Sequence, residues 1–220
     1  MAWPYDARSV ITFEPYCETK VAVLVVKAVV TVMGMKLELW ARDVTHRALA
    51  ASLPRRWAHV QGVAERAGQA RPLFGEDGAL LVAAAWLHDV GYADDLIDTG
   101  FHAIDGARYL RRIDAPDRLV NLVAHHSCAV LEAEQRGLSA ELAEFTDEES
   151  PVRDALWWAD MTTTPDGGRT TVTKRVAEIQ GRYGPDDVVS CFIRWAWPEL
   201  LAAIERTESA LEAAGIDYEK

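Results

Sequence analysis

Apolar residues recur at helical spacing along most of the chain from Met35 onward, which predicts an all-α fold. One stretch, Ala79 to Asp89, is apolar on every face up to its last two residues, so we expect a helix buried at the centre of the fold. Pro54 suits the first turn of another helix, which should run to about Ala67. The remaining helices are expected at Lys36 to Ser52, at residues 102–112, 116–126, 138–145, 150–161 and 172–182, and after Gly184, where Pro198 should break or kink the last one.

Residues 1–34 have a different pattern. They are rich in valine and show almost no helical periodicity, which favours a strand pair or a loose extension. Met35 follows Gly34 and could be the true start of the chain. We therefore predict a short non-helical N-terminal extension at residues 1–34 and one helical domain at residues 35–220. The longest apolar stretch, Val21 to Met33, is interrupted by Lys27 and is too short to span a bilayer.

Composition and charge narrow the function. The 220 residues suffice for one full hydrophobic core but not for two domains of usual size. A net charge of −11 disfavours electrostatic binding of DNA or RNA. A small anionic substrate is compatible with this charge, because a bound metal ion makes the potential locally positive. Three widely spaced cysteines form no disulfide framework and indicate a reducing compartment. We expect a cytoplasmic protein that binds neither a membrane nor a nucleic-acid polymer.

The histidines carry the main chemical signal. Five of the six lie between residues 59 and 126. Any one of them alone would more often be a hydrogen-bonded core residue than a ligand, but the ordered set, closed by a late aspartate, predicts a metal site. In order the residues are His59, the pair His88 and Asp89, His102, the pair His125 and His126, and Asp160.

The two aspartates stand where an anion is disfavoured. Asp89 and Asp160 each fall in the last turn of a predicted helix whose preceding residues are apolar. A helix C-terminus already carries partial negative charge, and a buried unpaired carboxylate costs more still. No lysine or arginine stands next to either aspartate in the chain. A metal ion is therefore the simplest source of the missing positive charge, with Zn, Mn, Fe or Mg as candidates.

The order of these residues resembles the H…HD…D signature of the HD-domain superfamily of metal-dependent phosphohydrolases. The resemblance covers roughly residues 54–165, with WLHDVGY (86–92), FHAIDGARYL (101–110), VAHHS (123–127) and WADMTT (158–163) in the style of the family. It implies a bundle of five or more helices with one or two divalent ions between them. It also implies roles for the residues: His59, His88, Asp89 and Asp160 would hold one ion, and His102, His125 and His126 would hold a second, with Asp89 bridging.

The resemblance implies hydrolysis of a small phosphate ester, a nucleotide being the favoured class, by a metal-activated hydroxide. Asp89 and His102 are the expected catalytic residues. The expected partner is a small phosphorylated substrate, and the chain could act as a homodimer. The chain lacks the lysine and the Gly-Tyr-Pro motif of cyclic-dinucleotide phosphodiesterases in the superfamily, which argues against that substrate.

Two other functions are compatible with the same residues. A diiron oxygenase of the superfamily would use a similar histidine-rich site, and oxidisable iron without phosphatase activity would identify it. A non-catalytic nucleotide-sensing domain is the third hypothesis, although the complete ligand set argues against it. Arg55 and Arg56 share a helix face with His59 and could bind substrate phosphate, or they could form an ordinary solvated basic turn.

Overall fold

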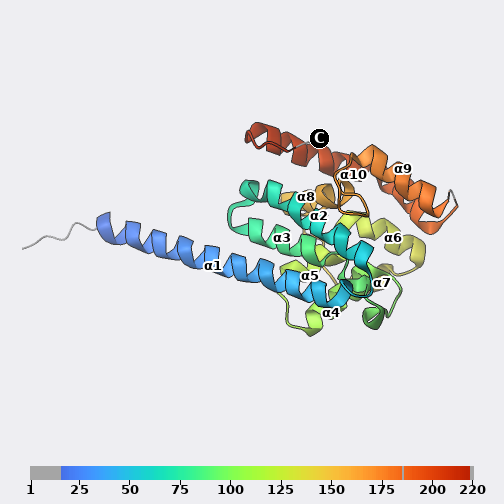
Figure 1. Cartoon of the computed structure of the whole chain (residues 1–220), viewed down its shortest axis with the longest axis horizontal. Helices are drawn as coiled ribbons and strands as arrows, with labels where there is room; N and C mark the ends of the chain where they lie inside the picture. The colour runs from blue at the N-terminus through green and yellow to red at the C-terminus, as the bar shows by residue number, and fades with distance from the viewer. Residues whose placement is uncertain (1–15, 185, 219–220) are drawn as a thin grey trace, which may run out of the picture.

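The computed structural model describes residues 16–184 and 186–218, and side chains from residue 33 onward (Figure 1). These ranges contain helices and no strand, so the predicted all-α fold is confirmed. Thr163 and Arg169 form an isolated antiparallel bridge. The α-helices are α1 (Tyr16–Leu49), α2 (Pro54–Ala70), α3 (Gly78–Leu87), α4 (His102–Arg112), α5 (Asp117–Ala124), α6 (Ala129–Arg136), α7 (Ser139–Leu142), α8 (Pro151–Met161), α9 (Val172–Tyr183) and α10 (Val188–Ala213).

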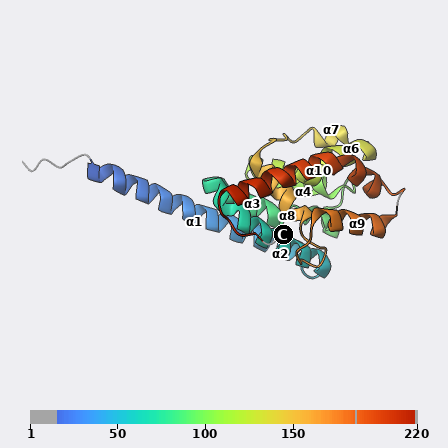
Figure 2. The ribbon, with the colours of Figure 1, turned by 90° about the horizontal axis from the view of Figure 1, so that it is seen from above.

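Helix α3 is the centre of the bundle, as its all-apolar sequence predicts. It packs against α1, α2, α5 and α8, and Figures 1 and 2 show it enclosed by its neighbours. Leu81 and Leu87 are fully buried on different faces of this helix, and of its ten residues only Leu80 and Trp86 are partly exposed. The two residues that follow α3, His88 and Asp89, are thereby fixed in the interior.

Helix α1 corrects the prediction of a non-helical extension at residues 1–34. It begins at Tyr16 and passes through Gly34 without interruption; residues 1–15 lie outside the described part of the chain. Valine lowers helix propensity by only a few tenths of a kcal/mol, so a helix already nucleated can propagate through such a segment. Gly34 has a packing role, because a Cβ there would lie 2.8 Å from the Cβ of Ala79 on α3. Within the described ranges, no helix has the combined length and apolar character of a transmembrane span.

Close backbone contacts join the later elements to the centre. The 3₁₀ turn η2 (Val90–Tyr92) packs against α4, where a Cβ on Gly91 would lie 2.1 Å from the carbonyl oxygen of His102. A second contact joins the loop after α8 to α2, because a Cβ on Gly62 would lie 2.3 Å from the carbonyl oxygen of Gly167. These glycines let two chain crossings approach to backbone contact, and each crossing carries residues of the candidate site.

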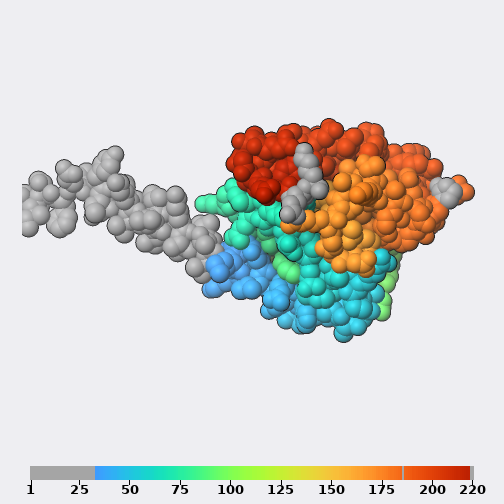
Figure 3. All heavy atoms as spheres, turned by 45° about the horizontal axis from the view of Figure 1, so that its top comes forward, coloured from blue at the N-terminus to red at the C-terminus, as the bar shows by residue number. Residues whose placement is uncertain are grey.

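Helix α10 packs against α8, α6 and α9 and closes the bundle. It continues through Pro198, so of the expected break or kink at that residue the break is wrong. Proline removes one backbone N–H, and the burial of Ala196 and Leu200 on either side stabilises the helix across that position. Figure 3 shows the orange and red-orange atoms of α9 and the start of α10 on the same face of the molecule as the atoms of α2.

The contact between η2 and α4 gives a test of the fold. Gly91→Ala should lower the free energy of unfolding by about 1–3 kcal/mol, because backbone atoms of His102 and Gly106 lie within 2.5 Å of the new Cβ and must move. Gly68→Ala is the matched control on α2, where a Cβ meets nothing within 4 Å, and it should raise the stability by up to about 1 kcal/mol. Chemical denaturation of both variants checks this, and equal stabilities would contradict the packing described.

Candidate metal centre

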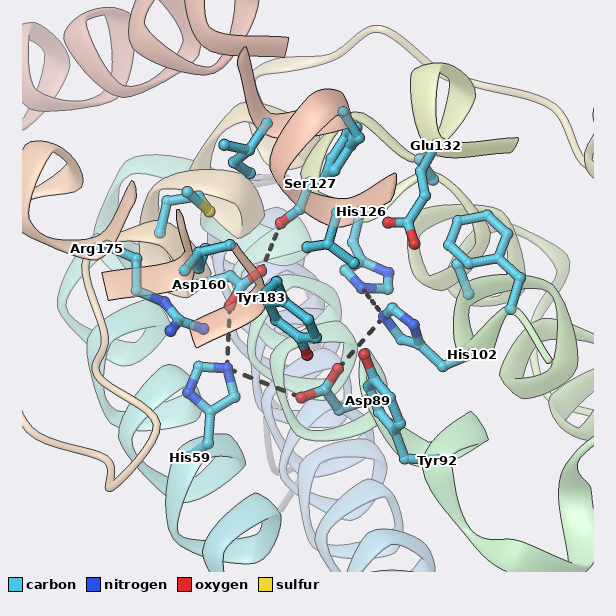
Figure 4. A pocket seen from close by; sticks show the side chains of 18 of the residues that line it. His59, Asp89, Tyr92, His102, His126, Ser127, Glu132, Asp160, Arg175 and Tyr183 are labelled. Carbon is cyan, nitrogen blue, oxygen red and sulfur yellow. Dashed lines mark hydrogen bonds and ion pairs between the residues drawn. The ribbon is translucent and has the colours of Figure 1, made fainter. Parts of the chain in front are cut away.

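Five helical segments deliver polar side chains to one buried cavity. Figure 4 shows His59, Asp89, His102, His126 and Asp160 pointing toward one another from different elements. The cavity has a volume of about 90 Å³. All the contributing groups except His102 are at least nine-tenths buried. They are His59 from α2, Asp89 after α3, His102 at the start of α4, His126 after α5, and Asp160 near the end of α8, with His88 in contact with Asp89 but not lining the cavity.

Three of the imidazoles are anchored in the same way, through Nδ1 to a backbone carbonyl oxygen. A carbonyl only accepts, so Nδ1 carries the proton and, in the neutral ring, Nε2 presents a lone pair to the cavity. Fixing the tautomer through the other ring nitrogen is the arrangement typical of metal-binding histidines. The pairs are His59 with Thr164 (3.0 Å), His88 with Ala85 (2.8 Å) and His126 with Val123 (2.6 Å).

The Nε2 atoms face carboxylate oxygens. Nε2 of His59 lies 3.0 Å from Oδ1 of Asp160 and 3.8 Å from Oδ2 of Asp89. Nε2 of His88 lies 3.4 Å from Oδ2 of Asp89 and, among the described residues, is buried without a hydrogen-bond partner. Lone pairs that face carboxylates at these distances repel one another unless a proton or a cation lies between them.

A second set of ligand atoms lies on the other side of Asp89. Nε2 of His102 lies 3.5 Å from Oδ1 of Asp89 and 3.0 Å from Nε2 of His126. The ligand atoms of these three residues lie within 4.8 Å of one another, and so do those of His59, His88 and Asp89. Asp89 belongs to both groups through its two oxygens, as the bridging role expected for it requires.

Arg56 corrects the argument that neither aspartate has a cationic neighbour. It comes from α2 rather than from the neighbouring sequence, and its Nη1 donates to Oδ2 of Asp89 at 2.7 Å. Its guanidinium carbon lies 3.9 Å from the centre of the Tyr92 ring. Asp160 has a different neighbour, because the Ser127 hydroxyl donates to its Oδ2. Part of the positive charge that the aspartates require is therefore supplied by protein, and the aspartates alone no longer argue for a metal.

The pKa values show where the cavity still prefers positive charge. Burial lowers the pKa of His88, but the charges of Asp89 and Asp160 outweigh burial and raise it to about 9. Burial and the neighbouring His126 hold the pKa of His102 well below its ordinary value. Burial likewise lowers the pKa of His126. The space between His88 and the carboxylates thus favours a cation, whereas His102 and His126 stay neutral and keep their lone pairs available.

His125 is a second correction. It was expected among the metal ligands, but its Nε2 lies 3.0 Å from the carbonyl oxygen of Phe145 and its own carbonyl accepts from the Trp157 indole. It lies outside the cavity that His126 enters. Adjacent residues at a helix end point in different directions, so only one of two neighbouring histidines can face the cavity.

Arg55 does not reach the cluster either. Its guanidinium forms an exposed ion pair with Asp166 (2.8 Å) and lines an adjoining hollow together with Arg56. Several further residues line the cavity and are not predicted by the sequence pattern, because no histidine or aspartate motif singles them out: three lie in α9, one in α6 and one in the turn after His126. They are Ser127, Glu132, Arg175, Arg182 and Tyr183.

Comparison with protein families identifies residues 56–156 as a match to the family model described as "HD domain". The match contains the ligand groups on α2, α3, α4 and after α5, and ends four residues before Asp160. No curated protein and no solved structure matches the chain.

The cluster predicts metal-dependent stability. Adding Mn²⁺ or Zn²⁺ at about 100 times its dissociation constant should stabilise the fold by about 2.7 kcal/mol, or roughly 5–10 °C in Tm. Asp89→Asn should abolish most of this shift, because Asp89 offers an oxygen to both ligand groups. His125→Asn should lower the starting Tm yet retain the shift. Differential scanning calorimetry checks both, and a shift lost in the His125 variant would contradict its placement outside the cluster.

Proposed function

Residues 56–156 are an HD domain, and from that premise we propose that the chain is a metal-dependent phosphohydrolase acting on a small phosphate ester, with a nucleotide as the favoured class. One observation carries the proposal. Nε2 of His88 is buried and unpartnered among the described residues, and it faces carboxylate oxygens together with Nε2 of His59. This donor set suits a divalent ion better than any single proton.

The residues present fit one ion, or two that share Asp89. His59, His88, Asp89 and Asp160 would hold the first, and Asp89, His102 and His126 the second. A divalent ion held there supplies Lewis acidity, which lowers the pKa of water and offsets the charge of phosphate oxygens. Nitrogen and oxygen ligands of this mixture accept Mn, Fe or Zn, with Mg as a further candidate.

The protein's own groups support hydrolysis in three ways. Burial of Asp89 and Asp160 keeps bulk water away from the reacting atoms, which strengthens every charge interaction inside. Arg56 holds Asp89 in place and keeps further N–H donors for a phosphate oxygen. Tyr92 stacks on His102 with ring centres 4.1 Å apart, which orients that imidazole toward Asp89.

Phosphate release tests the proposal. The metal-loaded chain should release phosphate from at least one member of a panel of small phosphate esters. Asp89→Ala should lose bound metal and turnover together while its circular dichroism stays helical, with turnover reduced at least about a hundredfold. Asp98→Asn, an exposed acidic residue outside the cavity, is the control and should keep both. Retained turnover in the Asp89 variant would rule out the proposed role.

The second ligand group predicts a stoichiometry. His102→Ala removes one of the three ligands around the second ion but none of those around the first. We expect metal analysis to give two ions per chain for the wild type and one for this variant. Two ions retained in the variant would show that His102 is not a ligand. Bound iron without any phosphate release would favour an oxygenase instead.

A further inference from the structure

A second hollow adjoins the metal-ligand cluster. We call it the arginine lobe; its volume is about 300 Å³. It shares four lining residues with the cavity of the cluster, so a ligand can occupy both: Arg56, His59, Arg175 and Arg182. Its remaining lining residues are Ser52, Leu53, Pro54, Arg55 and Pro165.

The charge of the lobe is opposite to that of the chain. Four arginines line it, and no acidic residue is among the lining residues in the described part of the chain. The whole chain carries a net charge of −11, so the lobe is a locally positive region on a negatively charged protein. A concave site of one sign focuses the field and attracts ligands of the opposite sign.

Carboxylates that do not line the lobe hold its arginines in position. Asp166 pairs with Arg55, and Glu178 pairs with both Arg175 and Arg182. These contacts occupy only some of the five N–H donors of each guanidinium. Donors remain that can bind a further acceptor in the lobe.

Arg175 points most directly to an anion. Its side chain is more than nine-tenths buried, and among the described residues its Nε has no hydrogen-bond partner. Figure 4 shows it extending from α9 toward the pair formed by His59 and Asp160. A buried guanidinium donor without an acceptor is costly, and a phosphate oxygen at the junction of cavity and lobe would supply the acceptor.

We infer that the substrate carries at least two phosphate groups, one bound at the metal-ligand cluster and the other in the arginine lobe. This inference rests on the proposed hydrolase activity. A monophosphate would engage the cluster and the arginines that also line its cavity, and would leave the lobe and the donors of Arg55 to solvent. A linear diphosphate and a molecule with two separate phosphates share the required chemistry.

Equilibrium binding to the metal-loaded full chain tests the inference, with phosphate release followed in the same samples. The probes are a nucleoside 5′-monophosphate, the 5′-diphosphate and the 3′,5′-bisphosphate. The wild type should bind at least one of the two doubly phosphorylated probes about tenfold or more tightly than the monophosphate. Tighter binding of the diphosphate alone would show that the substrate carries a linear phosphate chain. Tighter binding of the bisphosphate alone would show that it carries two separate phosphate groups.

Two variants identify the residues responsible. In the double variant Arg55→Gln/Arg182→Gln, the ratio of the affinity for the doubly phosphorylated probe to the affinity for the monophosphate should fall toward one. Arg112→Gln removes an exposed arginine of α4 that lines neither hollow, and should keep the wild-type ratio. Equal wild-type affinities for all three probes, or a wild-type ratio that persists in the double variant, would overturn the inference. Phosphate release together with equal affinities would overturn the inference and leave the hydrolase standing. Tighter binding of a doubly phosphorylated probe without phosphate release would contradict the hydrolase and leave only a binding site for two phosphates.

Discussion

Two carboxylates buried at helix ends impose the constraint on which the rest of the site depends. Asp89 and Asp160 stand where both desolvation and the helix dipole disfavour negative charge, so the surroundings must supply positive charge. Arg56 supplies part of it at Asp89. The raised pKa of His88 shows that a demand for positive charge persists even so. A divalent ion meets this demand at the point where imidazole lone pairs and carboxylate oxygens already converge.

The bundle satisfies this constraint through backbone geometry more than through side-chain chemistry. Backbone carbonyl oxygens orient three of the imidazoles, two of them borne by helices α3 and α5 and one by the loop after α8. The close crossing at Gly91 holds the start of α4 against the residues after α3, and the crossing at Gly62 holds the loop that bears the carbonyl partner of His59. The geometry of the site therefore depends on the packing of the core, because the contacts that stabilise the fold also orient the side chains that could bind a metal.

Sequence patterns predict the parts of this site that follow from local rules. An all-apolar helix must be central, and a His-Asp pair at its end must then be buried, so His88 and Asp89 are predictable. Direction around a helix end is not a local property, which is why His125 and His126 could not be told apart. The partnership of Arg56 with Asp89 joins positions 33 residues apart and depends on how α2 crosses α3. Arg175 lacked any motif, since an arginine on an amphipathic helix resembles ordinary surface charge.

The hollow over the ligand cluster is assembled from two separate stretches of chain. The floor comes from elements within residues 56–156 and from Asp160, whereas much of the rim comes from α9 and the start of α10. Amino-acid changes in the rim would meet the bound molecule without touching the histidines or aspartates below. Selection can therefore change substrate specificity while the reaction itself stays the same. Homologous proteins with an identical floor can differ widely in the substrates that they accept.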